Sequence, residues 1–208
     1  MRRLWPCLAL ALAFFGCEPK DSGEAHKAGL SPLRPEYAVL KTDKGAIVIH
    51  LFADKAPKTV ANFIGLATGA KPWRDPRDGK TRENTPLYNG ISFHRVIPGF
   101  MIQAGDPLGD GRGNVGFTIK DEFSPALRYG KPGMVGMASI GANSADSQFF
   151  ITLAPTPQLN DHNTLFGEVV SGLDVAKAIA AVPRNTEDGS DRPLSPVAIQ
   201  SVTITDKP

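Results

Sequence analysis

The chain has 208 residues, of which 41% are hydrophobic, and its 23 basic and 21 acidic side chains leave a formal net charge of +2. So small a surplus argues against a nucleic-acid partner, because phosphate binding requires a clear excess of basic residues on the surface. The sequence also lacks the motifs G-x-S-x-G and H-E-x-x-H, so its serines, aspartates and four histidines do not indicate a hydrolase or a metal enzyme. We therefore expect no bound metal.

Residues 1–16 have the layout of a secretory signal, with two early arginines before an apolar run from Leu4 to Phe15. That run is too short to span a bilayer as a stable helix. Cys17 directly follows Gly16, and this pair resembles the cleavage point of bacterial lipoproteins, in which the cysteine is acylated and becomes the new N-terminus. The two phenylalanines before Gly16 depart from that pattern, which usually has leucine and a small residue. The alternatives are an ordinary signal peptide with an incidental cysteine and a retained membrane anchor.

Export would leave a nearly uncharged protein with one cysteine. Cleavage after Gly16 removes two arginines and Cys7, so the mature net charge is about zero and an internal disulfide is impossible. Residues 17–36 are rich in proline, glycine and charge and have no helical or strand period, as is typical of a flexible tether. A random coil of this length spans on the order of 25 Å. We therefore expect an exported protein that Cys17 anchors to a bacterial membrane, facing the periplasm or the cell exterior.

Residues 37–208 are numerous enough for one domain with a sizeable core. The apolar patterns of 37–42 and 46–52 predict two strands, and the Asp-Lys-Gly turn between them predicts a hairpin. Residues 56–68 carry apolar side chains at helical spacing, with a proline near the start and Gly69 just past the end. This segment is predicted to be a helix with one apolar face, suited to cover the end of a barrel.

The rest of the chain predicts short strands separated by polar connections. Residues 70–90 form a long connection that contains both proline and glycine. The glycine-dense segment 105–116 does not indicate a phosphate loop, because no Lys-Ser or Lys-Thr pair follows and no helix pattern opens after it. We expect it to wrap the sheet beside the functional site. The other expected elements are strands from Ile91, over Gly133–Ala138, Gln148–Leu153 and Val197–Thr205, and a helix over Leu173–Ala181.

Two stretches carry the functional signal, Ser92–Asp106 with the sequence S-F-H-R-V-I-P-G-F-M-I-Q-A-G-D and Ser147–Thr152 with S-Q-F-F-I-T. In the first, the permanent cation of Arg95 stands among apolar residues with few carboxylates to neutralise it. This combination indicates a pocket. The alternative is a pair of ordinary core strands with a solvated arginine.

Both stretches, their order and their separation resemble the cyclophilins, the peptidyl-prolyl cis-trans isomerases that bind cyclosporin. The run F-H-R-V-I-P-G-F-M-I-Q-A-G-D is similar to the signature of that family, and Gly133–Thr152 resembles its second active-site segment. The resemblance extends from about Tyr37 to Thr205. It implies a mainly β fold, an eight-stranded antiparallel barrel capped by two helices. It also implies a monomer that acts on proline-containing polypeptides without cofactor or metal.

The resemblance implies roles for particular residues. Arg95 and Gln103 match the catalytic positions, with Gln103 as the neighbour that holds the guanidinium. Phe93, His94 and Phe149 are assigned to structure, because alternation along a strand turns them away from the residues that face the pocket. The positions implied to bind substrate are Phe100, Met101, Ala138, Ser139, Gln148, Phe150 and Leu159.

Two departures from the commonest family pattern lie in Pro157–Asn163. Gln158 stands where cyclosporin-sensitive members carry tryptophan, and Asn163 falls where a histidine or tyrosine usually faces the pocket, while His162 is out of register by one residue. A more polar rim is expected to weaken inhibitor binding more than catalysis. The function that follows is isomerisation of X-Pro bonds during the folding of exported proteins, and the alternative is a proline-peptide-binding module without useful catalysis.

Overall fold

The structure is a computed structural model that describes residues 36–208. The predicted signal segment, the acylation site Cys17 and all of the tether except Glu36 lie outside the described residues. Within residues 36–208, no helix is long and apolar enough to cross a membrane. The same residues contain no group of three or more His, Cys, Asp or Glu side chains that could hold a metal ion.

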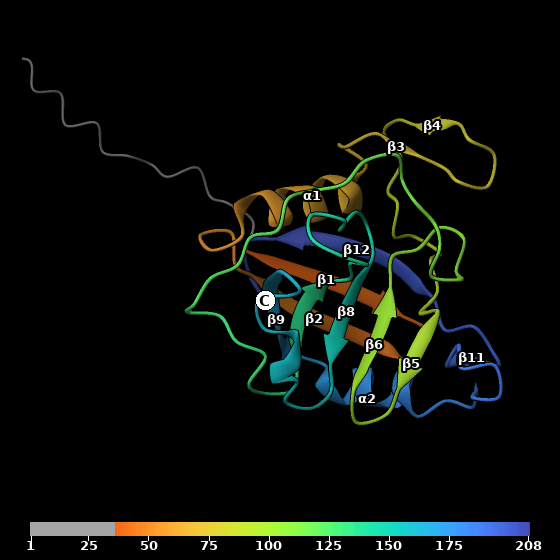
Figure 1. Cartoon of the computed structure of the whole chain (residues 1–208). Helices are drawn as coiled ribbons and strands as arrows, with labels where there is room; N and C mark the ends of the chain where they lie inside the picture. Colours follow the sequence, from red (N-terminus) through yellow and green to blue (C-terminus); the bar gives the residue numbers. More distant parts are fainter. Residues whose placement is uncertain (1–35) are drawn as a thin grey trace, which may run out of the picture. The chain divides into compact units, whose positions relative to one another are not determined.

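A curled antiparallel sheet of eight strands forms the body of the domain (Figure 1). Its strands follow the order β12-β1-β2-β9-β7-β8-β6-β5. The two edges meet where Phe93 donates its amide to Val197 O at 2.9 Å and Gly90 donates to Ile199 O at 2.7 Å. The predicted mainly β fold is confirmed. The strands are β1 (Tyr37–Thr42), β2 (Gly45–Leu51), β5 (Arg95–Ile97), β6 (Met101–Ala104), β7 (Met134–Met137), β8 (Phe149–Thr152), β9 (Leu165–Ser171) and β12 (Ile199–Thr205).

The first two strands form the predicted hairpin, with pairing from Tyr37 opposite His50 to Thr42 opposite Gly45. The Thr42 hydroxyl donates to Gly45 O at 2.7 Å across the turn. Strand β9 was not predicted as a strand, although Leu165–Ser171 pairs with both β2 and β7 and so joins the two halves of the sheet.

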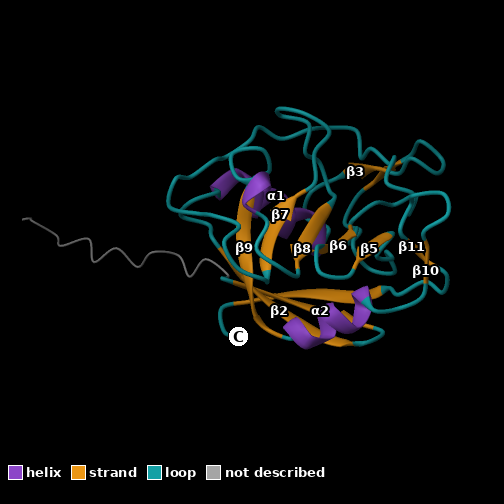
Figure 2. Ribbon diagram, turned by 60° about the horizontal axis from the view of Figure 1, so that its bottom comes forward, coloured by secondary structure: helices purple, strands orange, loops and turns teal. Residues whose placement is uncertain are grey.

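Two α-helices pack against the sheet, α1 (Pro57–Thr68) and α2 (Leu173–Ala180), close to the predicted limits. Helix α1 contacts β12, whereas α2 contacts β2, β5 and β6, and Figure 2 shows the two helices on different sides of the curled sheet. Gly69 ends α1 with a φ of 79°, a left-handed conformation that favours glycine. A side chain there would also collide with the backbone of Thr85.

The start of α1 receives its cap from a distant loop, because its own N-cap residue, Ala56, has no capping side chain. The Glu122 carboxylate accepts the amides of Lys58 at 3.1 Å and Thr59 at 2.8 Å. The residue before it, Asp121, exchanges two backbone-to-side-chain hydrogen bonds with Asn143, at 2.7 and 3.0 Å. The segment 121–122 therefore connects the beginning of α1 to the loop that contains Asn143.

The connection 70–90 contains an unpredicted small hairpin, β3 (Trp73–Arg74) paired with β4 (Thr81–Arg82). The buried carboxylate of Asp75 holds it together by accepting hydrogen bonds from Arg77 and Arg82 at 2.7–3.1 Å. These guanidinium contacts lower the pKa of Asp75 well below its ordinary value. A second two-stranded sheet pairs β10 (Arg184–Asn185) with β11 (Arg192–Pro193).

An aromatic cluster fills the interior of the curled sheet. Phe63 of α1 lies at its centre, with its ring centroid 5.1 Å from that of Tyr88, 5.6 Å from Phe149 and 5.4 Å from Phe166. All four rings are fully buried. Phe93 and His94 are buried as well, so the three residues assigned to structure do lie in the interior. Burial lowers the pKa of His94, which keeps its ring neutral.

Replacing Phe63 by alanine is expected to lower the free energy of unfolding by about 3–5 kcal/mol, because it leaves a cavity at the centre of this cluster. Urea unfolding of the full chain, followed by fluorescence, measures the change. The matched control is Phe123→Ala, at a side chain that is 46% exposed, which is expected to cost about 0.5 kcal/mol or less. Equal losses in the two variants would contradict the assignment of Phe63 to the core.

Candidate functional site

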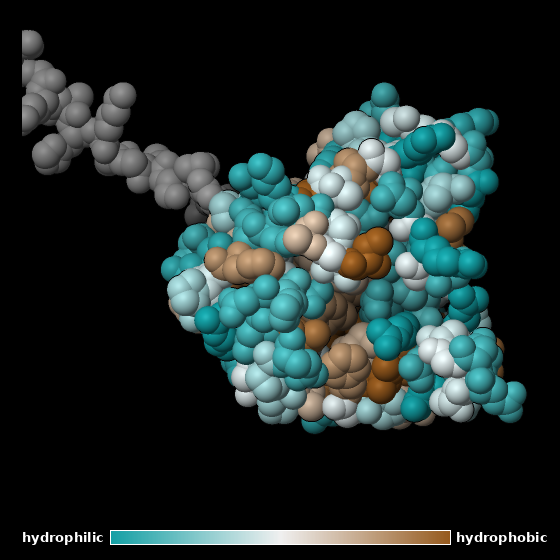
Figure 3. All heavy atoms as spheres, in the orientation of Figure 1, coloured by the Kyte–Doolittle hydropathy of each residue, from teal (hydrophilic) through white to brown (hydrophobic). Residues whose placement is uncertain are grey.

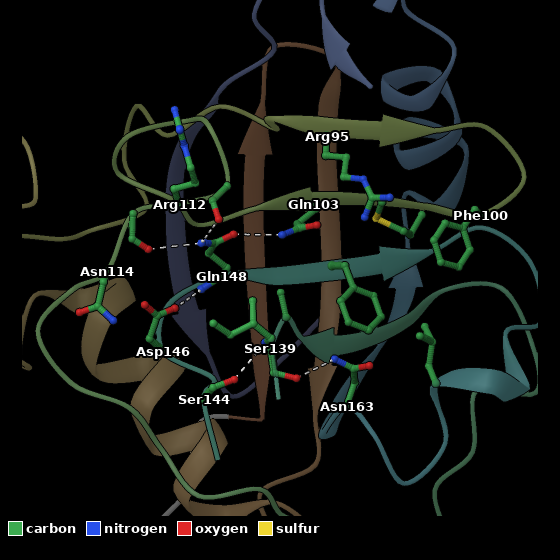
Figure 4. A pocket seen from close by; sticks show the side chains of 17 residues that line it. Arg95, Phe100, Gln103, Arg112, Asn114, Ser139, Ser144, Asp146, Gln148 and Asn163 are labelled. Carbon is green, nitrogen blue, oxygen red and sulfur yellow. Dashed lines mark hydrogen bonds between the residues drawn. The ribbon is translucent and has the colours of Figure 1, made fainter. Parts of the chain in front are cut away.

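One cavity of about 630 Å³ opens on the outer face of β5, β6 and β8. Figure 3 shows a hollow with apolar side chains on this face of the domain, and Figure 4 shows the side chains that line it. All nine residues predicted for the site line this cavity: Arg95, Phe100, Met101, Gln103, Ala138, Ser139, Gln148, Phe150 and Leu159.

Strand pairing brings the central residues together. Arg95 of β5 stands opposite Gln103 of β6, and Gln103 stands opposite Phe150 of β8. Directly paired residues in an antiparallel sheet point to the same face with their Cβ atoms about 5 Å apart. The cation, the amide and the aromatic ring therefore form a row across three strands. Phe150 joins this row although it lies 47 residues after Gln103 in the sequence.

The guanidinium of Arg95 makes no hydrogen bond or ion pair with the residues that the structure describes, and the side chain is half-buried. The predicted contact with Gln103 is therefore absent. Instead, Gln103 Nε2 donates to Gln148 Oε1 at 3.0 Å, and Gln148 Nε2 donates to the carbonyl oxygens of Gly111 and Gly113 at 3.2 and 3.3 Å. Arg95 thus presents its donors to the cavity, while the two amides connect β6 and the start of β8 to the glycine-dense loop.

An apolar wall occupies the end of the cavity beside Arg95. It consists of Phe100, Met101, Phe150 and Leu159, the last at the end of the 3-10 helix η1 (Pro157–Leu159). The ring of Tyr129 stacks behind Phe150, with centroids 5.8 Å apart, and its hydroxyl donates to Asn163 O at 3.1 Å. Burial raises the pKa of Tyr129, which keeps the phenol neutral.

Gly136 makes room for this stack. It stands opposite Phe150 in the sheet, and a Cβ atom at this position would collide with the rings of Phe150 and Tyr129. A glycine is therefore required for both aromatic side chains to lie against β7.

The rim of the cavity has the register expected from the sequence. Asn163 lines the cavity and donates to Met137 O at 2.9 Å and to Ser139 Oγ at 3.2 Å. Its neighbour His162 is exposed and does not line the cavity. Gln158 is also exposed and lies outside the lining, one residue before Leu159, which does line it.

The opposite end of the cavity is polar, and sequence reasoning missed its residues. The glycine-dense segment 105–116 was expected beside the site, but none of its residues was named. Asp146 could have been found from the period of two that connects it with Gln148 and Phe150. The missed lining residues are Gly111, Arg112, Gly113, Asn114, Ile140, Ser144 and Asp146.

Comparisons with known proteins agree with this geometry. Residues 37–204 match the family described as cyclophilin type peptidyl-prolyl cis-trans isomerase/CLD. The chain is 47% identical over 175 residues to peptidyl-prolyl cis-trans isomerase A of Mycobacterium tuberculosis (strain H37Rv), which covers 84% of this chain and 95% of that protein. It is 48% identical over 170 residues to peptidyl-prolyl cis-trans isomerase B of Streptomyces anulatus, covering 81% of this chain and 95% of that protein.

Solved structures show the same fold. A cyclophilin type peptidyl-prolyl cis-trans isomerase of Cryptosporidium parvum superposes with a TM-score of 0.70 at 30% identity, covering 83% of this chain and 99% of that chain. A second structure of that protein, in the presence of the dipeptide Ala-Pro, gives a TM-score of 0.68 at 31% identity over 81% and 98% of the two chains. The chain belongs to the cyclophilin family. It is a peptidyl-prolyl cis-trans isomerase.

The polar rim leads to a prediction about cyclosporin. Gln158→Trp is expected to raise the affinity for cyclosporin tenfold or more, because an indole there adds apolar contact that glutamine lacks. A gain of about 50 Å² of buried apolar surface corresponds to roughly 1.3 kcal/mol, close to tenfold in affinity. Calorimetric titration of the full chain measures it. The control is Gln200→Trp, at an exposed glutamine on β12 outside the cavity lining. Tight binding by the unmodified chain, or an equal gain in the control, would contradict the prediction.

Proposed function

We propose that this isomerase is an exported lipoprotein that accelerates X-Pro isomerisation during the folding of exported polypeptides, with Arg95 as its catalytic residue. The observation that carries the mechanistic part is the half-buried guanidinium of Arg95, which has no partner among the described residues and borders an apolar wall. Proline-containing polypeptides are its substrates. We further propose that the protein acts as a monomer, without a cofactor, a metal or a nucleic-acid partner.

To accelerate the reaction, the enzyme has only to lower the barrier to rotation about the X-Pro bond. Rotation about an X-Pro bond faces roughly 18–20 kcal/mol, because amide resonance stiffens the C–N bond, whereas the cis and trans forms differ by only about 0.5–1 kcal/mol. In the twisted transition state the prolyl nitrogen regains its lone pair and becomes a hydrogen-bond acceptor. A donor held beside that nitrogen therefore binds the transition state more strongly than the ground state.

The cavity supplies the two parts that this mechanism needs. Phe100, Met101, Phe150 and Leu159 offer an apolar surface to the proline ring, which has no amide hydrogen to satisfy. Arg95 stands next to this surface, and its planar group offers several N–H donors to the nitrogen of the twisted bond. The amide of Gln103 lies beside it, oriented by Gln148 to meet the peptide backbone. No covalent step is required.

Export and anchoring are supported by residues 1–36. The charged start, the apolar segment and the Gly16-Cys17 pair have the layout of a lipoprotein signal, and the Pro- and Gly-rich segment after Cys17 has the composition of a tether. A site that faces the periplasm or the cell exterior would meet polypeptides as they emerge from export. Folding there includes proline steps that take tens to hundreds of seconds without a catalyst.

Arg95→Ala is expected to reduce kcat/KM for a proline peptide at least tenfold, about 1.4 kcal/mol of transition-state stabilisation, with little change in peptide binding. Phe150→Ala is expected to weaken peptide binding as well as turnover, because the ring contacts the proline in both states. Exchange NMR on the full chain in mild detergent measures binding and isomerisation together. Full activity of a folded Arg95→Ala protein would remove Arg95 from the mechanism. A wild-type protein that binds proline peptides but does not isomerise them would be the non-catalytic binding module instead.

Cys17→Ser is expected to release the protein from membranes or to leave an uncleaved precursor, because acyl chains on Cys17 would supply the anchor. Membrane fractionation and intact-mass spectrometry of the wild-type and variant proteins test this expectation. The control is Cys7→Ser, which changes the cysteine inside the signal segment and is expected to leave both anchoring and mass of the mature protein unchanged. A mature wild-type protein that is unmodified and wholly soluble would overturn the lipid anchor.

A further inference from the structure

The polar end of the cavity contains a carboxylate that the isomerisation mechanism does not use. Asp146, Gln148 and Phe150 occupy alternate positions that lead through a bend at Ser147 into strand β8. All three line the cavity, and Phe150 belongs to its apolar wall. Figure 4 shows Gln148 and Asp146 at the polar end, beside Arg112 and Asn114. The site thus has an acidic group in line with its proline-binding surface.

Asp146 is buried, with only 7% of its surface exposed, yet it forms no ion pair with any residue of the described chain. Its Oδ1 accepts the amides of Ser147 and Gln148, the latter at 3.3 Å. No hydrogen bond within the described residues goes to Oδ2, although the amide of Val115 lies close enough to lower the pKa of the carboxyl, so the carboxylate keeps acceptor capacity for a bound molecule. Buried carboxylates are normally paired with a cation, because removal from water disfavours an isolated charge. The missing cation would have to come from a bound molecule.

The charged groups around Asp146 do not supply that cation. Burial raises the pKa of Asp146, the amides of Ser147, Gln148 and Val115 oppose this change, and the Asp106 carboxylate adds a smaller upward effect. Arg112 lines the same end of the cavity, but it pairs with Asp110 at 2.8 Å and is 84% exposed. The neighbouring lining residues Asn114 and Ser144 are neutral. The carboxylate of Asp146 is therefore the one acidic group at this end of the cavity without a cationic partner among the described residues.

The spacing of residues 146 and 150 limits how far a substrate cation lies from the proline. The two residues are four positions apart, so their separation is at most the extended length of about 13 Å, and the bend at Ser147 shortens it. A peptide lying along this row advances about 3.3 Å per residue, and a lysine or arginine side chain adds roughly 6 Å of reach. A basic side chain two or three residues from the proline can therefore meet Asp146 while the proline ring contacts Phe150.

We propose that Asp146 makes this isomerase selective for proline segments that carry a lysine or arginine two or three residues from the proline. The ammonium or guanidinium group donates to Oδ2 of Asp146, and Asn114 and Ser144 offer further polar partners. An acidic side chain at the same place meets like charge and is disfavoured. This selectivity rests on the proposed function, because it requires that the cavity bind proline peptides in the stated orientation.

The experiment compares peptides that are identical except at one position. A central Ala-Pro is flanked at the second and third positions on either side by lysine, by norleucine, which keeps the apolar stem, or by glutamate. The ratio of kcat/KM values is measured by exchange NMR with the full chain in mild detergent. At the best position we expect the wild-type protein to prefer lysine over norleucine about tenfold and to turn over the glutamate peptide more slowly than the norleucine peptide.

Asp146→Asn removes the charge and keeps the shape, so the lysine-to-norleucine ratio is expected to fall to about one; Asp146→Ser serves if the asparagine variant does not fold. The matched control is Asp54→Asn, which removes one negative charge at a side chain that is 73% exposed and outside the cavity, and is expected to keep the wild-type ratio.

A wild-type ratio near one at every position, or a lysine preference that survives both Asp146 substitutions, would overturn the proposal. Either result would leave the isomerase function intact, because both require turnover of the norleucine peptide. A wild-type protein that isomerises none of the peptides would instead refute the proposed function.

Discussion

The structure depends on the alternation of side chains along two adjacent strands, β6 and β8. On β6, Ile102 and Ala104 face the aromatic core, while Met101 and Gln103 face the cavity. On β8, Phe149 and Ile151 face the core and Phe150 faces the cavity. Each strand therefore contributes to the stability of the domain and to the site with neighbouring residues. A shift of one residue in the pairing would exchange the two sets, so the register that buries the core also positions the site.

This shared register explains why a site with so few interacting polar groups can be well ordered. Gln103 of β6 bonds to Gln148, the residue before β8, and Gln148 continues to the carbonyl groups of Gly111 and Gly113. These bonds satisfy the buried amide of Gln148 and hold the glycine-dense loop against the cavity. The loop needs no side chains of its own at those two glycines, since its backbone makes the contact. Arg95 is left out of the network, so its donors are available to a substrate.

Patterns that span a few residues were sufficient to predict the hairpin, both helices and most strands. The Asp-Lys-Gly turn directly follows strand β1. Helix α1 has a proline at its start and Gly69 just past its end. All nine named site residues line the cavity. Eight of them lie in the two motifs that resemble the family, and Leu159 follows in Pro157–Asn163, within the same resemblance. The sequence did not indicate β9 as a strand or the hairpin of β3 and β4. Their stability comes from pairing with distant residues and from the buried carboxylate of Asp75, neither of which leaves a local period.

The interactions of individual side chains were harder to predict than their positions. Gln103 was expected to hold Arg95 from the resemblance to the family, and the two residues do face each other across β5 and β6. In the structure, the side-chain amide of Gln103 donates to Gln148 instead. Gln148 in turn donates to the carbonyl oxygens of the glycine-dense loop. Asp146 was missed for a related reason. Its environment is created by Gln148, Asp106 and the loop 105–116, which become neighbours only in the folded chain.

The cap of α1 has a consequence for motion. Glu122 satisfies the first amides of the helix, and Asp121 beside it holds Asn143 in the rim loop that also displays Ile140 and Ser144. Two adjacent residues thus join a helix end and a cavity rim that are far apart in the sequence. Proteins open locally in contiguous cooperative units, and the hydrogen bonds of residues 121 and 122 make these two places contiguous. We therefore expect fraying of the first turn of α1 to be coupled to widening of the substrate entrance.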